Sequence, residues 1–173
     1  LEAEGFDTSR VLYRGSNRDF DPSRTYKAPL KNPPKDAEGR VQVVDLEGVP
    51  PTYLSTSPSV AAEYADGDGG RIMPAYIRGR YFDFRNVDDV AKLQTAARAK
   101  TFLKRANIIG ETYKTYAHAT PEQLMHFLHT HDPEVMAWLQ RAGYDGFIGH
   151  ESGADHFAVF DRAANIRPVA SSA

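Results

Sequence analysis

The sequence contains no cysteine among its 173 residues. This absence excludes disulfide bonds, zinc sites built on thiolates and cysteine nucleophiles. Long apolar runs are also missing, so we expect no membrane-spanning helix. The net charge is only −2, from 21 basic and 23 acidic residues, which gives no overall attraction to nucleic acid or anionic lipid. Internal repeats and low-complexity segments do not stand out either.

What is present is the composition of an ordinary globular protein. Hydrophobic residues make up 41% of the chain and charged residues 25%. A length of 173 residues is enough to bury a sizeable core and matches the usual size of one domain. We therefore predict a single domain over residues 1–173.

The stretch 51–65 predicts a short strand, a turn and the start of a helix. Tyr53 and Leu54 favour a strand. Ser57 is a good helix N-cap and Pro58 suits the first position of the helix. Because a strand end and a helix start collect side chains and free N–H groups at one place, this corner is a candidate binding site.

Two tyrosines flank this corner, and three hydroxyl side chains lie between them. Tyr53 and Tyr64 are separated by ten residues, and Ser55, Thr56 and Ser57 follow Tyr53 closely. The two rings would sandwich a flat ligand ring, and the hydroxyls would orient a polar neighbour. The alternative interpretation is that both tyrosines belong to the core and the triplet is only a helix cap.

A second candidate corner lies at residues 11–16. Val11, Leu12 and Tyr13 indicate a strand, and the sequence then continues with Arg14, Gly15 and Ser16. An arginine at a strand end would grip a phosphate through two parallel hydrogen bonds, and a glycine lets a ligand approach the backbone. A surface arginine in a turn is the simpler alternative.

The rest of the chain divides into a long connection, helices and strands. Residues 17–50 are rich in proline and lysine and predict an irregular wall or lid between the two corners. Residues 87–105 and 133–142 carry helical apolar stripes. Residues 151–155 predict a polar loop, and residues 156–160 a buried strand.

Two further groupings carry charge or ligand chemistry. Residues 71–105 hold nine arginine or lysine residues against three aspartates, which indicates either a solvated face or a surface that approaches phosphate. His126, His129 and His131 match no strong zinc spacing, so we expect no metal site.

Taken in order, four stretches resemble the ADP-ribosyltransferase-like superfamily, and most closely the toxin-type domains of polymorphic and phage-associated bacterial proteins. They are residues 5–16, residues 53–65, residues 143–148, and residues 157–161 with Asn165 and Ile166. The resemblance spans nearly the whole chain. Each motif is weak alone, and the ordered set is moderately specific.

The resemblance implies an α+β fold, a split β-sandwich of two small packed sheets with flanking helices, which binds NAD in a cleft. Arg14 resembles the first-strand arginine of the family, and Gly15, beside Ser16, resembles the residue whose backbone holds the nicotinamide amide. Ser55, Thr56 and Ser57 resemble the serine motif of the arginine-type branch. Tyr53 and Tyr64 resemble the tyrosine pair that sandwiches nicotinamide in the diphtheria-toxin and poly-ADP-ribose polymerase branch, so the chain mixes features of both.

The chain departs from the family at the third position, where a glutamate precedes the penultimate core strand. His156 stands there, with Asp155 beside it and Glu151 five residues back. A carboxylate would stabilise the positive charge that develops on the ribose. A histidine instead suits a general base. We predict that Asp155 and His156 carry the third catalytic role jointly, with Glu151 next in line.

The function implied by the resemblance is that of a mono-ADP-ribosyltransferase toxin or effector domain that uses NAD as substrate. It would be secreted or delivered to the cytoplasm of a target cell, without membrane binding, and have a cognate immunity protein. The acceptor is a macromolecule, with protein ranked first and RNA a close second. A catalytically inactive binding module and an NAD glycohydrolase are the alternatives.

Overall fold

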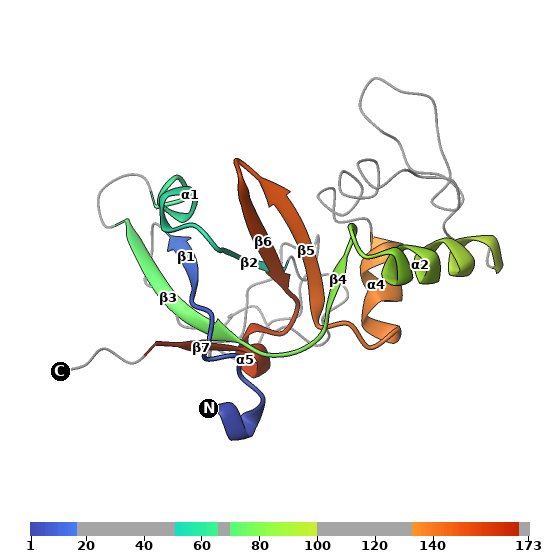
Figure 1. The fold of residues 1–173 in the computed structure, drawn as a ribbon, viewed down its shortest axis with the longest axis horizontal. Coiled ribbons are helices and arrows are strands. Elements are labelled where there is room, and N and C mark those ends of the chain that lie inside the picture. The colour runs from blue at the N-terminus through green and yellow to red at the C-terminus, as the bar shows by residue number, and fades with distance from the viewer. Residues whose placement is uncertain (17–50, 66–69, 100–132, 170–173) are drawn as a thin grey trace, which may run out of the picture.

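The computed structural model describes residues 1–16, 51–65, 70–99 and 133–169 (Figure 1). The expected connection over 17–50 and the three histidines between 126 and 131 lie outside these residues. The described elements are the 3₁₀ helix η1 (Glu2–Glu4), the strands β1 (Leu12–Ser16), β2 (Thr52–Ser55), β3 (Arg71–Ile77), β4 (Tyr81–Asp83), β5 (Gly146–Glu151), β6 (Ala154–Val159) and β7 (Ile166–Pro168), and the helices α1 (Pro58–Ala62), α2 (Val87–Ala99), α4 (Pro133–Arg141) and α5 (Arg162–Asn165).

All described strands join in one seven-stranded sheet of order β4-β5-β6-β2-β1-β3-β7. Only β4 and β5 are parallel, and every other pair is antiparallel. The expected α+β class is confirmed. The sheet has two halves, since β1 and β2 share a single register pair, Tyr13 with Ser55, in the described chain.

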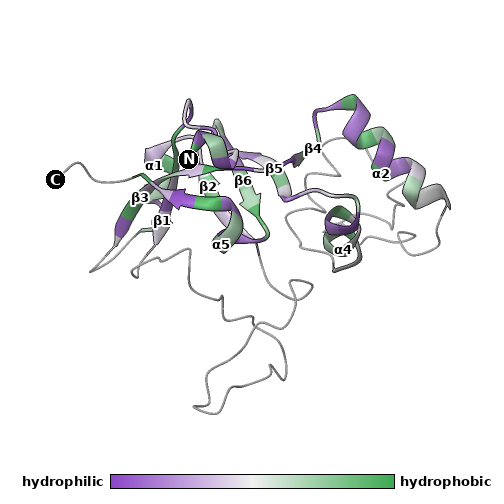
Figure 2. Ribbon diagram, turned by 90° about the horizontal axis from the view of Figure 1, so that it is seen from below, coloured by the Kyte–Doolittle hydropathy of each residue, from purple (hydrophilic) through white to green (hydrophobic). Residues whose placement is uncertain are grey.

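Two apolar clusters form the core, one on each face of the sheet. The first gathers Phe82, Leu93, Leu139 and Phe147, which are all fully buried, where α2 and α4 pack beside β4 and β5. Hydrophobic and hydrophilic residues alternate along α2, as expected for a helix with one face inward (Figure 2). The second cluster lies on the opposite face, and its members include Leu12, Leu54, Ala75, Phe157 and Ile166.

The helix after the central strand begins as the sequence predicts. Ser57 is the N-cap of α1, and its Oγ accepts a hydrogen bond from the Val60 N–H at 3.4 Å. Pro58 occupies the first helical position, where its missing N–H is not needed. Among the described residues, no helix is long and apolar enough to cross a membrane.

The expected polar loop over residues 151–155 is wrong, because a tight hairpin takes its place. β5 continues to Glu151 and β6 begins at Ala154, so Glu151 and Ala154 are register partners. Ser152 and Gly153 form the turn with φ of 53° and 78°. Two positive φ angles match the turn type that fits the twist of an antiparallel pair. The polar residues of this stretch therefore belong to the end of a sheet.

Candidate active site

His156, the residue at the third position, lies on the strand next to the corner formed by Ser55, Thr56 and Ser57, which we call the serine corner. His156 of β6 is the register partner of Ser55 of β2, and both residues are only 3% exposed. Tyr53 lies two residues back on the same face of β2 and packs edge-on against the Phe147 ring, with the ring centroids 6.2 Å apart. The structure thus brings Tyr53, Ser55 and His156 together on one face.

Gly15 lies directly beneath the end of α1 and the base of Tyr64. A Cβ atom at Gly15 would lie 1.7 Å from the carbonyl oxygen of Ala61 and 3.3 Å from the Tyr64 Cβ. Tyr64 itself is 53% exposed. The fold therefore requires glycine here, and the sandwich of a ligand ring between Tyr53 and Tyr64 remains a prediction.

Arg14 lies in β1 next to the point where the described pairing between β1 and β2 ends. Its Nη1 donates a hydrogen bond to the backbone carbonyl of Tyr53 at 3.2 Å. Beyond the Tyr13–Ser55 pair, Gly15 and Ser16 are paired with Ile72 and Arg71 of β3, and the described ladder has no further β1–β2 pair. Arg14 lies inside β1 rather than after its end, and strand alternation puts its side chain on the face that holds Leu12, opposite to Tyr53 and Ser55.

Local hydrogen bonds hold the serine triplet. The Ser57 N–H donates to Ser55 Oγ at 3.0 Å, and the Ser57 and Ser59 hydroxyls lie 2.9 Å apart. Thr56 Oγ1 accepts from the Asp155 N–H at 3.1 Å, while the Thr56 N–H donates to the Asp155 carbonyl at 3.0 Å. The capping role is confirmed, and a role of these hydroxyls toward NAD remains a prediction.

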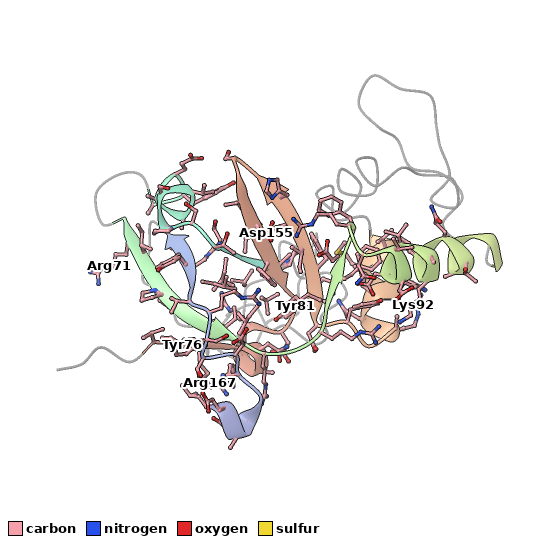
Figure 3. All side chains as sticks on the ribbon, in the orientation of Figure 1. Arg71, Tyr76, Tyr81, Lys92, Asp155 and Arg167 are labelled. Carbon is pink, nitrogen blue, oxygen red and sulfur yellow. The ribbon has the colours of Figure 1, made fainter. Side chains whose placement is uncertain are left out.

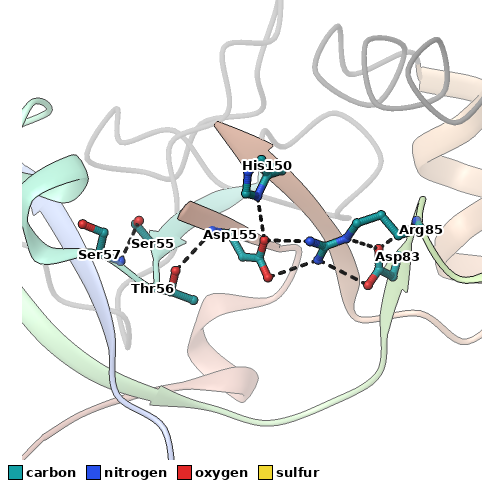
Figure 4. A network of polar contacts seen from close by, with 7 residues as sticks. All are labelled: Ser55, Thr56, Ser57, Asp83, Arg85, His150 and Asp155. Carbon is teal, nitrogen blue, oxygen red and sulfur yellow. Dashed lines mark hydrogen bonds and ion pairs between the residues drawn. The ribbon is translucent and has the colours of Figure 1, made fainter. Parts of the chain in front are cut away.

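Asp155 is the centre of a polar network at the hairpin (Figure 4). Arg85 donates from Nη1 and Nη2 to its two carboxylate oxygens, both at 3.1 Å. His150 Nδ1 lies 2.9 Å from Oδ1 of the same carboxylate. Partial burial opposes ionisation of Asp155, but the bonds from Arg85 and His150 outweigh it and lower its pKa below the ordinary value.

Asp155 and His156 do not face the same space. They are consecutive residues of an extended strand, so their side chains leave opposite faces of the sheet. Asp155 meets Arg85 and His150, whereas His156 is buried beside Ser55. The backbone of Glu151 pairs with Ala154 at the end of the hairpin. The structure brings His156, but not Asp155, to the face that holds Tyr53.

Arg85, His150 and Asp83 are network members that the sequence alone did not single out. Arg85 follows β4 and also donates from Nε to Asp83 Oδ1 at 3.2 Å. The hairpin register was the available signal, because a two-residue turn at positions 152 and 153 places His150 opposite Asp155. No local signal points to Arg85, which is 70 residues away from Asp155 in the chain.

The basic stretch 71–105 does not form one surface in the part of the chain that is described. Arg71 and Lys92 lie at opposite ends of the molecule (Figure 3). Arg85 is engaged by Asp83 and Asp155, and the Arg80 guanidinium stacks on the Tyr144 ring at 4.5 Å. No group of three or more histidine, aspartate or glutamate side chains able to hold a metal occurs among the described residues.

The α+β fold, the divided sheet and the order of its motifs are those of an ADP-ribosyltransferase-like domain. The sequence profile of the ADP-ribosyltransferase in polyvalent proteins matches residues 8–166. The chain therefore belongs to this ADP-ribosyltransferase family. None of the curated proteins and none of the solved structures matches it significantly.

Proposed function

We propose that the chain transfers ADP-ribose from NAD to a macromolecular acceptor, and that this acceptor is a protein. The observation that supports the proposal is that Ser55 of β2 lies opposite His156 of β6, while Gly15 of β1 packs under the end of α1 beside the Tyr64 Cβ. Family membership supports NAD as the substrate. The wide separation of Arg71 and Lys92 favours protein over RNA, since an RNA backbone needs a continuous cationic surface.

In this proposal the nicotinamide half of NAD binds where the pairing of β1 and β2 ends. The half-exposed Tyr64 stacks on nicotinamide, Tyr53 closes the other side, and the carboxamide bonds backbone groups of Gly15 on the side away from the end of α1. Arg14 exchanges its bond to the Tyr53 carbonyl for the NAD diphosphate, because a guanidinium binds phosphate better than a neutral carbonyl. Clamping both ends of the substrate orients its ribose for attack.

The reaction breaks the bond between ribose C1′ and the nicotinamide nitrogen. The electron pair of that bond leaves with nicotinamide, which becomes neutral, and positive charge develops on the ribose. An acceptor oxygen or nitrogen forms the new bond to C1′ and loses its proton. His156 is the group we assign to the third position, where its imidazole bonds the ribose or receives that proton.

A binding module without turnover is the second candidate. The observation that favours it is the state of Asp155, because both oxygens of this carboxylate are engaged by Arg85 and His150. A family glutamate would stabilise the developing ribose charge, and a buried histidine supplies no comparable negative charge. A module of this kind would bind NAD through Tyr64 and Gly15 and leave it intact.

The deciding experiment incubates the chain with NAD labelled in the adenylate half and with a whole-cell lysate. Transfer predicts a labelled macromolecule and free nicotinamide in equal amounts, and protease should release the label. Release by nuclease instead would identify RNA as acceptor. Loss of NAD without labelled macromolecule would indicate a glycohydrolase, and binding by calorimetry without loss would indicate the module.

The role of His156 is tested with the variant His156→Gln, which keeps a hydrogen-bonding group of similar reach and removes the titratable ring. We expect NAD affinity to persist and turnover to fall by about 100-fold or more, as for removal of a group that acts in the transition state. Full turnover in this variant would remove His156 from the reaction. Delivery into a target cell as a toxin, and a cognate immunity protein, are further parts of the proposal that a toxicity assay in the target cytoplasm would test.

A further inference from the structure

We propose that Arg85 is a positioning residue for the serine corner and the third position, and that it acts through Asp155. The inference rests on the proposed function for its activity readout. In structural terms, this proposal means that Asp155 keeps the residues of the site in position and does not itself contact the ribose. A polar network joins the end of β4 to the start of β6 (Figure 4).

Arg85 binds the Asp155 carboxylate through two hydrogen bonds, and the same guanidinium is also held by Asp83. Both terminal nitrogens of the guanidinium donate to the Asp155 carboxylate at 3.1 Å. The Nε atom and one Nη of the same group donate to the Asp83 carboxylate at 3.2 and 3.5 Å. Two carboxylates therefore fix the plane of the guanidinium, which is the geometry in which an arginine is directionally specific.

Asp155 passes this constraint to the serine corner through its backbone. Its N–H donates to Thr56 Oγ1 at 3.1 Å, and its carbonyl accepts from the Thr56 N–H at 3.0 Å. Thr56 lies between Ser55 and Ser57, the N-cap of α1. His156 is the next residue of β6 and faces Ser55. A displacement of Asp155 would thus move both the third position and the helix cap.

The charges around Asp155 explain why it is a strut and not the catalytic carboxylate. The described groups that face it are Arg85, His150 and, behind the guanidinium, Asp83. These contacts use both of its oxygens on the face of the sheet opposite to Tyr53 and His156. A carboxylate neutralised in this way has little charge left to stabilise a ribose cation.

The test compares Arg85→Gln, Asp155→Asn and the double variant, with Lys92→Gln as a matched loss of one positive charge far from the network. Initial rates of nicotinamide release give kcat and KM for NAD. Positioning predicts that each single variant lowers kcat by about 10-fold to 100-fold with little change of KM, and that Lys92→Gln changes neither. Because the two residues act as one unit, the double variant should be no worse than the poorer single variant.

Asp155 acting alone would give another pattern. In that case Asp155→Asn would lower kcat much more than Arg85→Gln, the two losses would multiply, and the proposal would be overturned. Unchanged kcat in Arg85→Gln would overturn it as well. Arg85→Lys keeps the charge without the fork, so positioning by a bidentate contact predicts only partial recovery relative to Arg85→Gln.

Amide hydrogen exchange provides a readout that does not depend on activity. The Asp155 and Thr56 amides are hydrogen bonded across β6 and β2. Positioning predicts faster exchange of these two amides in Arg85→Gln, with unchanged exchange in β3. Unchanged exchange at Thr56 and Asp155 would overturn the proposal even if the protein showed no turnover, whereas absent turnover with faster exchange would count only against the proposed enzymatic function.

Discussion

Gly15 has no space for a side chain, because the first strand packs closely at this position against the helix that follows β2. A Cβ would lie 1.7 Å from the Ala61 carbonyl oxygen, a backbone atom that cannot rotate away. We expect Gly15→Ala to lower the free energy of unfolding by about 1–3 kcal/mol, as overpacking does, and also to weaken NAD binding. Denaturant melts and calorimetry measure the two effects.

Gly5→Ala is the control for Gly15→Ala. Gly5 has a φ of 88°, and no atom lies within 4 Å of its Cβ position, so the variant meets backbone strain alone. It should be destabilised by about 1–2 kcal/mol with no loss of NAD affinity. Equal losses of affinity in both variants would show that Gly15 acts only through stability.

Replacing Tyr64 and replacing Tyr53 by alanine should affect protein stability differently, although both changes should weaken NAD binding. Tyr64 is half-exposed, so Tyr64→Ala should leave the melting temperature nearly unchanged and weaken NAD binding by about 2-fold to 10-fold, the value of a stacked ring pair. Tyr53 packs against Phe147, so Tyr53→Ala should in addition lower stability by about 3 kcal/mol. ADP-ribose, which lacks nicotinamide, should lose no affinity in Tyr64→Ala.

At the scale of elements, the ionised carboxylate of Asp155 contributes to the stability of the β5–β6 hairpin. Asp155 has a lowered pKa, so its contribution to stability is present above the ordinary aspartate pKa of about 3.9 and is lost as pH falls through the lower folded value. Arg85→Gln removes the donor that contributes most to this lowering. Acid unfolding of the variant should therefore begin at higher pH than that of the unmodified chain, as followed by circular dichroism.

If the Arg85→Gln variant instead began to unfold at lower pH than the unmodified chain, this would contradict the assignment of Arg85 as the main partner of Asp155. Asp155→Asn is the matched control, because it has no ionisation at this position. Its acid transition should not shift further when Arg85 is also changed.

Local signals predicted some elements correctly. Ser57 and Pro58 correctly predicted the start of α1. The apolar stripe of residues 133–142 correctly predicted α4, in which Val135 and Leu139 are buried. Capping and periodicity are properties of neighbouring residues, so one sequence suffices to read them.

Long-range contacts could not be predicted in the same way. The sequence predicts a loop at Ser152 because the strands of this hairpin end in polar residues that do not alternate with apolar ones. The pairing of Arg85 with Asp155 leaves no periodic mark, and the approach of Gly15 to Ala61 depends on how α1 packs. His156 is assigned to the third position only through the resemblance to the family, and its position opposite Ser55 became visible only in the strand register.

At the scale of the whole molecule, a sheet joined in the middle by one register pair should respond to a ligand bound across the junction. NAD that contacts both Gly15 and Tyr53 would connect the two halves. At a free concentration 100 times its dissociation constant, NAD should add about 2.7 kcal/mol to the free energy of unfolding, which corresponds to a rise in melting temperature of about 5–10 °C. Scanning fluorimetry measures this shift, and adenosine alone should give less of it.

The strand order also determines when the site can exist. Thr52 of β2 pairs with Val159 of β6, so the strand that carries the serine corner waits for a partner made more than a hundred residues later. Contacts between such distant segments form late and slowly. A ribosome that has completed only the first two thirds of this chain has therefore made Arg14, Gly15 and both tyrosines without their third partner. Partial translation products therefore lack the strand that carries His156, and the candidate site is complete only after the C-terminal strands have emerged.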